Sequence, residues 1–215
     1  MCAVANEPYA VLISSGSAAA YKLLQGERQM DDRKSARDIA TQLLATLPSS
    51  PTSAPAEPGF YAWWCRRKYL SDASPMIPHE PRPPVPEEWS LLYVGISPST
   101  LTSRRHLAAR LIKNHAHGNI GASTFRLSVA SLLLAKLDLQ PRTGSDRARV
   151  KSEEPLTAWI ERSCGVTFAI TGRPWEFEAA VITQLNPPLN LDRGTHPFRL
   201  HVQKERAALR RSCGL

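Results

Sequence analysis

The sequence predicts an α+β fold with a small three-stranded antiparallel sheet flanked by helices. Three short runs rich in aromatic and β-branched residues, at 59–64, 91–94 and 166–170, have the composition of strands. Longer segments with apolar residues at three- and four-residue spacing predict helices between and after these runs. A chain of 215 residues with a hydrophobic share of 42% can bury one core and still carry extensions.

The first two strands are expected to form a hairpin with a long insertion. The first, GFYAWW, spans Gly59–Trp64, and the second, LLYV, spans Leu91–Val94. The stretch between them carries prolines at positions 75, 78, 81, 83, 84 and 86. Because proline cannot donate a backbone hydrogen bond, this stretch cannot join a sheet centrally and is predicted to be an extended surface loop.

Four core helices are predicted. The first runs from Leu101 to His115, and the second begins at the N-cap pair Ser123–Thr124. A short helix is expected over 156–164. The last begins at Pro174, which suits the first helical position, and ends before Pro187. The apolar stripe of the first helix is Leu101, Leu107, Ala108, Leu111 and Ile112, and that of the second is Phe125, Val129, Leu132, Leu133 and Leu137.

The chain divides into three parts. Residues 1–57 are predicted to be an N-terminal helical extension and linker, because the composition is helical over 21–47 and proline- and serine-rich from Pro48. Residues 58–192 hold the strands and core helices. Residues 193–215 are predicted to form a basic C-terminal helical tail.

Charge and cysteine usage limit the possible partners. A net charge of +8 and a pI near 9.6 predict an anionic partner, and nucleic acid is the leading candidate. The four cysteines are far apart with no C-x-x-C pair, which argues against a zinc ribbon and a disulfide scaffold. No signal or membrane helix is expected, and so the protein is predicted to be cytoplasmic, with reduced thiols and no membrane partner.

One carboxylate of the last core helix lies on its apolar face. Val181, Ile182 and Leu185 follow Glu178 by three, four and seven positions, so Glu178 shares their side of the helix. A carboxylate on a buried face is costly unless it is paired or binds a metal. A structural ion pair with an arginine and a functional carboxylate fit this observation equally well.

The order of several short motifs resembles the GIY-YIG nuclease superfamily. Gly59-Phe60-Tyr61 stands where that family has GIY, and Tyr93-Val94-Gly95 where it has YIG. Arg110, Glu178 and the triplet ending in Asn190 follow in the family's order. The segment 109–133 is similar to a branch of stand-alone bacterial members. The resemblance covers about 58–192 and identifies this part as a GIY-YIG-like nuclease domain, although its proline-rich insertion is far longer than the family hairpin loop.

The resemblance implies a divalent-metal-dependent endonuclease that hydrolyses phosphodiester bonds in DNA. Glu178 would hold one Mg²⁺ (or Mn²⁺) ion, which prefers carboxylate oxygen and keeps several waters. Arg110 would bind the scissile phosphate, with Arg104 as the alternative. Tyr93 is assigned as general base and Tyr61 as its orienting partner, and these two roles could be exchanged.

Further residues complete the implied site. His115 could orient water or bind phosphate, or it could simply cap the end of its helix. Asn190 would fix the backbone of the site and Glu178 by hydrogen bonds. The implied nucleic-acid contacts are Arg104, Arg105, Lys113, Ser123, Thr124 and Arg126.

Two alternatives compete with the nuclease interpretation. One is a non-catalytic nucleic-acid-binding module on the same scaffold, and the other is an unrelated basic protein with accidental matches. The combination of two tyrosines, an arginine, a glutamate and an asparagine favours an enzyme, because a carboxylate would repel phosphate in a pure binding module. The sequence leaves open DNA against RNA, sequence or structure specificity, protein partners, oligomeric state and pathway.

Overall fold

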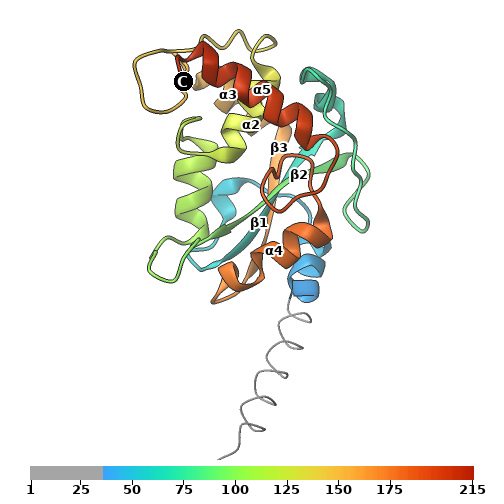
Figure 1. The fold of residues 1–215 in the computed structure, drawn as a ribbon. Helices are drawn as coiled ribbons and strands as arrows, with labels where there is room; N and C mark the ends of the chain where they lie inside the picture. Colours follow the sequence, from blue (N-terminus) through green and yellow to red (C-terminus); the bar gives the residue numbers. More distant parts are fainter. Residues whose placement is uncertain (1–35) are drawn as a thin grey trace, which may run out of the picture.

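A computed structural model describes residues 36–215, in which helices cover both faces of a three-stranded antiparallel sheet (Figure 1). Strand β1 spans Gly59–Arg66, β2 spans Trp89–Ser97 and β3 spans Cys164–Ile170, in the order β2-β1-β3. The predicted α+β class and its small antiparallel sheet are confirmed. Each strand extends beyond its predicted boundaries at one or both ends.

The central strand β1 is buried on both faces, with side chains that alternate between two cores. Phe60, Ala62 and Trp64 pack against a helix over 36–45 and against α4 (Pro174–Leu185). Tyr61 and Trp63 face the opposite core, which is covered by the remaining helices. These are η3 (Ala109–Ala116), α2 (Thr124–Leu133), α3 (Glu154–Ser163) and α5 (Arg199–Ser212).

A β-bulge in β2 places two neighbouring residues, Leu92 and Tyr93, on the face of Tyr61. Trp63 pairs with Tyr93, but the next residue, Trp64, pairs with Leu91, so Leu92 is the extra residue of β2. Leu92 and Tyr93 consequently both pack in the core of Tyr61. Without this bulge, strict alternation would leave only one of these two neighbours on that face.

The first core helix begins later than predicted and has a different form. Leu101 is 77% exposed in a turn before the helix, so it is not part of the apolar stripe. Residues 109–116 form a π-helix, in which His117 N–H donates to the Ile112 carbonyl five residues back at 2.9 Å. This wider turn brings Arg110 and His115, five residues apart, to one side of the helix.

Residues 36–57 pack onto the sheet within the described part of the chain. Ser49 forms a β-bridge with Val166 through hydrogen bonds of 2.9 and 2.8 Å, and a short turn of 3₁₀-helix, η1 (Pro51–Ser53), follows. Leu43 is fully buried and its carbonyl accepts from Thr167 Oγ1 at 2.8 Å. The predicted linker is therefore part of the packed structure. The rest of the predicted N-terminal extension lies outside the described residues.

The loop after β1 and the C-terminal tail also contribute to the core. A 3₁₀-helix, η2 (Arg67–Asp72), precedes the proline-rich stretch, in which Ile77 and Val85 are buried. In the tail, α5 lies along α2 (Figure 1) and buries Val202 and Leu209. Among residues 36–215, no helix is long and apolar enough to cross a membrane.

Candidate active site

The segment after α4 fixes the outer edge of β2. Helix α4 ends at Asn186, whose left-handed backbone turns the chain back toward the sheet. Leu189 N–H then donates to the Leu92 carbonyl at 3.0 Å. The side-chain amide of Asn190 accepts from Val94 N–H at 2.9 Å and donates to the Val94 carbonyl at 2.8 Å. Asn190 thus fixes the strand that carries Tyr93, and both of these hydrogen bonds go to the backbone rather than to Glu178.

A buried chain of hydrogen bonds holds the hydroxyl of Tyr61. His115 Nε2 lies 2.6 Å from the Tyr61 hydroxyl, and His115 Nδ1 lies 2.6 Å from Ser123 Oγ. All three side chains are almost fully buried. The expectation that His115 contacts water or phosphate directly is therefore corrected, because both ring nitrogens are occupied inside the protein. His115 is also more than a helix cap, since it holds Tyr61.

The His115 ring is held by a hydroxyl at each nitrogen, Tyr61 at Nε2 and Ser123 at Nδ1. Ser123 Oγ also accepts the backbone N–H of Arg126 at 3.1 Å. A neutral ring donates to one of the two hydroxyls and accepts from the other. Burial lowers the pKa of His115 well below its ordinary value, and nearby Arg110 adds to this, so the ring is neutral.

The side chain of Tyr61 packs directly over Gly95. The two residues are partners in the β1–β2 register, and a Cβ at Gly95 would collide with the ring and hydroxyl of Tyr61. Gly59 has an equivalent constraint, since a Cβ there would collide with the carbonyl of Ala169 in β3. Both motif glycines are thus required by close approach rather than by a special backbone angle.

Arg110 lies beside both tyrosines. Burial raises the pKa of Tyr61 and of Tyr93 above their ordinary values, and the charge of Arg110 opposes this in both cases. The two rings are 6.4 Å apart between centroids. Tyr93 is only half-buried, and its hydroxyl lies 3.1 Å from Thr124 Oγ1 at the start of α2. The guanidinium of Arg110 is therefore close to two tyrosines, the buried Tyr61 and the half-buried Tyr93.

Glu178 and Tyr93 line one cavity of about 500 Å³, together with Asn190. Burial raises the pKa of Glu178, Arg193 lowers it, and Asp192 raises it. Arg193 Nη1 lies 3.5 Å from Glu178 Oε2, in a pair whose side chains are 50% and 28% exposed. A pair this exposed contributes little to stability. The carboxylate is thus held at a cavity wall with access to solvent.

Two predicted nucleic-acid contacts are wrong, because their side chains are buried. Arg126 is fully buried and forms a salt bridge of 2.8 Å with Glu153. Its guanidinium also donates to the carbonyls of His115 and Ala116 at 3.1 and 2.6 Å. Arg126 therefore stabilises the end of η3 and cannot reach a phosphate. Ser123 is similarly buried, with its hydroxyl used by His115 and by the backbone of Arg126.

The other predicted contacts are accessible. Arg104, Arg105, Lys113 and Thr124 are exposed. Thr124 lines the cavity of Glu178, and Arg105 shares a smaller cavity of about 290 Å³ with Arg110. Arg110, rather than Arg104, is the arginine beside the tyrosines.

Tyr61, Tyr93, Arg110, Glu178 and Asn190 follow one another in the order expected from the motifs. They lie on β1, β2, η3, α4 and the segment after α4. A family model described as the GIY-YIG catalytic domain matches residues 59–212. The chain belongs to the GIY-YIG family. Membership implies a nuclease-type function on nucleic acid, and GIY-YIG nucleases generally depend on a divalent metal. No curated protein and no solved structure matches the chain.

The GIY-YIG match extends into α5, where sequence reasoning missed Arg206. This side chain lines the cavity of Glu178 and is close enough to Tyr93 to act on its pKa. The basic tail was expected to be helical but was given no role in the site. Val202 and Leu209, seven positions apart on that tail, are the pattern from which a helix packed against the domain could have been inferred.

Proposed function

We propose that this GIY-YIG domain is an endonuclease that hydrolyses phosphodiester bonds in DNA, with one Mg²⁺ or Mn²⁺ ion held by Glu178. The observation that carries the proposal is the shared cavity of Tyr93, Glu178 and Asn190. Thr124 is shared with the wall of a second, adjoining cavity that Arg110 lines. A phosphate at the junction of the two cavities would lie between a cationic side chain and a carboxylate.

The side chains at the cavity fit a hard divalent ion. Within 36–215 there is no group of three or more acidic, histidine or cysteine side chains suited to hold a metal. A single carboxylate, with water and phosphate oxygens completing the shell, is an arrangement that Mg²⁺ commonly takes. An ion bound there supplies neutralisation of the charge that develops on the phosphate and on the leaving oxygen. Glu178 must be ionised for this, so the raised pKa of its carboxyl makes ion binding weaken as the pH falls.

Arg110 binds the scissile phosphate in this proposal. A guanidinium offers a fork of donors that matches two phosphate oxygens, and it stays charged at every working pH. Its place beside both tyrosines brings the phosphate to the groups that handle the proton. Flanking phosphates would contact the exposed side chains of Arg104, Arg105, Lys113 and Thr124.

Tyr93 acts as general base. Tyr93 lines the cavity of Glu178, whereas Tyr61 is almost fully buried and its hydroxyl is held by His115. A base must reach the water whose proton it takes, and this favours Tyr93. Tyr93 accepts the proton as phenolate, a form that burial opposes and that the Thr124 hydroxyl, Arg110 and Arg206 favour, because burial raises the pKa of Tyr93 and these three groups lower it. Tyr61 and His115 act as positioning residues that hold Arg110 and the Tyr93 ring.

Incubation of the purified protein with plasmid, branched DNA and RNA, with and without Mg²⁺, tests this function. We expect Mg²⁺-dependent cleavage of DNA that a chelator abolishes. Binding of DNA without cleavage of any substrate at any divalent ion would contradict the enzyme and favour the binding module. Arg193→Gln is the matched control, because it breaks the ion pair with Glu178 but leaves the carboxylate. It should retain cleavage if Glu178 serves the ion rather than the pair.

A further inference from the structure

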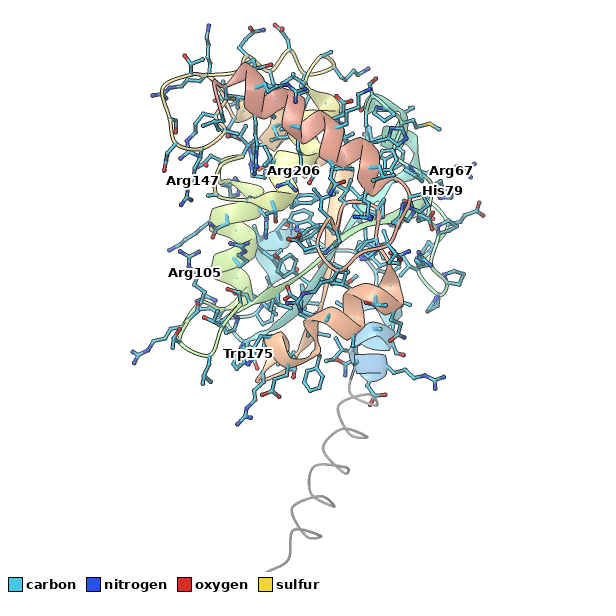
Figure 2. All side chains as sticks on the ribbon, viewed as in Figure 1. Arg67, His79, Arg105, Arg147, Trp175 and Arg206 are labelled. Atoms are coloured by element: carbon cyan, nitrogen blue, oxygen red, sulfur yellow. The ribbon has the colours of Figure 1, made fainter. Side chains whose placement is uncertain are left out.

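A second, larger cavity lies beside the proposed active site. It has a volume of about 680 Å³ and is enclosed by η3, the start of α2, the segment 146–148 and α5. Its basic lining residues are Arg110, Arg147, Arg206, Arg210 and Arg211. In Figure 2, Arg105 and Arg147 lie at the left of the molecule, Arg206 lies near the middle and Arg67 lies at the right.

Four of the five arginines of this cavity form no salt bridge within the described residues. Arg110, Arg206, Arg210 and Arg211 form no salt bridge with any carboxylate of the described residues. Only Arg147 has one, a pair of 4.0 Å with the exposed Asp146 at the rim. Burial lowers the pKa of Arg206, and the charge of Arg210 lowers it further. Asp146 is the one acidic side chain among the lining residues, so the arginines outnumber it by five to one, and a bound anion would stabilise this excess of positive charge.

The cavity adjoins the proposed active site. Arg206 and Thr124 line both this cavity and that of Glu178, and Arg110 lies beside the tyrosines. An anion in the second cavity would therefore be a close neighbour of the scissile phosphate. Successive phosphates of one strand meet this requirement, because they repeat along the backbone at short, regular intervals.

Packing and a hydrogen bond fix helix α5, which forms one wall of the cavity. Helix α5 packs on α2 and buries Val202 and Leu209. At its end, Cys213 Sγ lies 3.2 Å from the carbonyl of Arg149, which ties α5 to the segment on the other side of the cavity. A rigid helix of this kind suits a site that must keep a polymer in one register.

We propose that this cavity binds a backbone phosphate of the nucleic-acid strand next to the one that is cleaved, with Arg210 and Arg211 as its principal donors and Arg206 shared between the two phosphates. The inference rests on the proposed function, because it places the second phosphate by reference to the first. It assigns to the C-terminal helix the task of fixing where along the strand the cut is made.

The double variant Arg210→Ala/Arg211→Ala tests the proposal, with Lys204→Ala as control. Lys204 is an exposed cation on the same helix that does not line the cavity. Affinity for a single-stranded and a duplex DNA oligonucleotide is measured at several salt concentrations, in a Glu178→Gln background that does not cut. We expect the double variant to bind roughly tenfold more weakly or worse. The slope of log affinity against log salt should fall by about 0.7 per lost contact for the single strand and about 0.9 for the duplex.

The outcomes separate this proposal from the proposed function. Wild-type affinity and salt slope in the double variant, or an equal loss in Lys204→Ala, would overturn the second phosphate site even if the protein cleaves DNA. Arginine-dependent binding in a protein that cleaves nothing would support the site and reject the nuclease. In a cleaving protein, the double variant should raise KM with little change in kcat, and it should broaden the set of cut positions.

Discussion

Tyr61 and Tyr93 have the same side chain but different surroundings. Tyr61 is buried, with its hydroxyl fixed by a neutral histidine, while Tyr93 is half-buried at the cavity of Glu178. The difference follows from their strands, because Tyr61 lies on the central strand β1 and Tyr93 lies on the edge strand β2. The two tyrosines therefore have different proposed roles, Tyr93 as general base and Tyr61 as a positioning residue.

Tyr93→Phe should lower the single-turnover cleavage rate about 10²–10⁴-fold, the usual contribution of a positioned general base. Its thermal stability should change little, because the hydrogen bond that it loses, to Thr124, lies at the surface. Tyr61→Phe should instead destabilise the protein by about 1–3 kcal/mol, since His115 Nε2 loses its buried partner. Rates and melting curves of both variants check this. If Tyr93→Phe cleaves at the wild-type rate, Tyr93 is not the general base and Tyr61 takes that role.

Gly95→Ala should both destabilise the domain and displace Tyr61. The added Cβ meets the ring and hydroxyl of Tyr61, which is a rigid obstacle, and overpacking of this kind costs about 1–3 kcal/mol. Gly172→Ala is the control, because its Cβ meets nothing within 4 Å. Denaturant titrations of the two variants give the comparison. Equal stability of Gly95→Ala and wild type would show that Tyr61 can move away without cost.

At the scale of elements, η3 is the least regular and the most informative. Its π-helical hydrogen bonds place Arg110 and His115 on one side although they are five residues apart. An α-helix brings residues four apart to the same face. Single π-helical turns inside α-helices occur frequently at functional sites. The π-helical backbone thus compensates for the five-residue spacing between Arg110 and His115.

Deletion of the exposed Lys113 should therefore be tolerated. It leaves Arg110 and His115 four residues apart, and the segment can revert to an α-helix with both side chains still facing the tyrosines. We expect the cleavage rate to remain within about tenfold of wild type. Insertion of an alanine after Lys113, by contrast, suits neither helix and should abolish cleavage. If the deletion is as harmful as the insertion, the compensation by the π-helix is refuted.

The elements that could be predicted are those with a strong local pattern. The aromatic run of β1, the Ser123 cap of α2 and the Pro174 start of α4 each carry their signal within a few residues. The π-helix could not be predicted, because its apolar positions also fit an α-helix. Arg126 was misjudged for a related reason: a basic residue at a helix start suggests solvent, but every residue from 125 to 133 is buried. Only the three-dimensional position of Glu153 explains the burial.

The packed structure includes more of the chain than the segment that carries the motifs. The helix over 36–45 covers the sheet face opposite to the tyrosines, and α5 covers the other side (Figure 1). The family match also continues to residue 212. The cavities depend on this completion, because α5 supplies Arg206 to both of them. Charge composition predicted an anionic partner but not the side on which the arginines gather, since that depends on packing.

Leu43→Ala should lower the free energy of unfolding by about 2–5 kcal/mol, as expected for a leucine removed from a packed core. Leu43 is fully buried between the sheet and its own helix. Leu47→Ala should be close to neutral, because Leu47 is 66% exposed on the same segment. Chemical denaturation of both variants tests whether residues 36–47 belong to the folded unit. Equal, small effects would show that they do not.

The central claim is that Glu178 serves a metal-dependent cleavage step, and Glu178→Gln tests it most directly. Single-turnover cleavage with Mg²⁺, DNA affinity and Tm are measured on the same samples of wild type and variant. Because burial raises the pKa of Glu178, its ionised form is less stable in the folded protein than in the unfolded chain. At neutral pH the variant should therefore keep or raise its Tm, bind DNA at least as tightly, and cleave at least about 100-fold more slowly. Full cleavage by a well-folded Glu178→Gln protein would contradict the account.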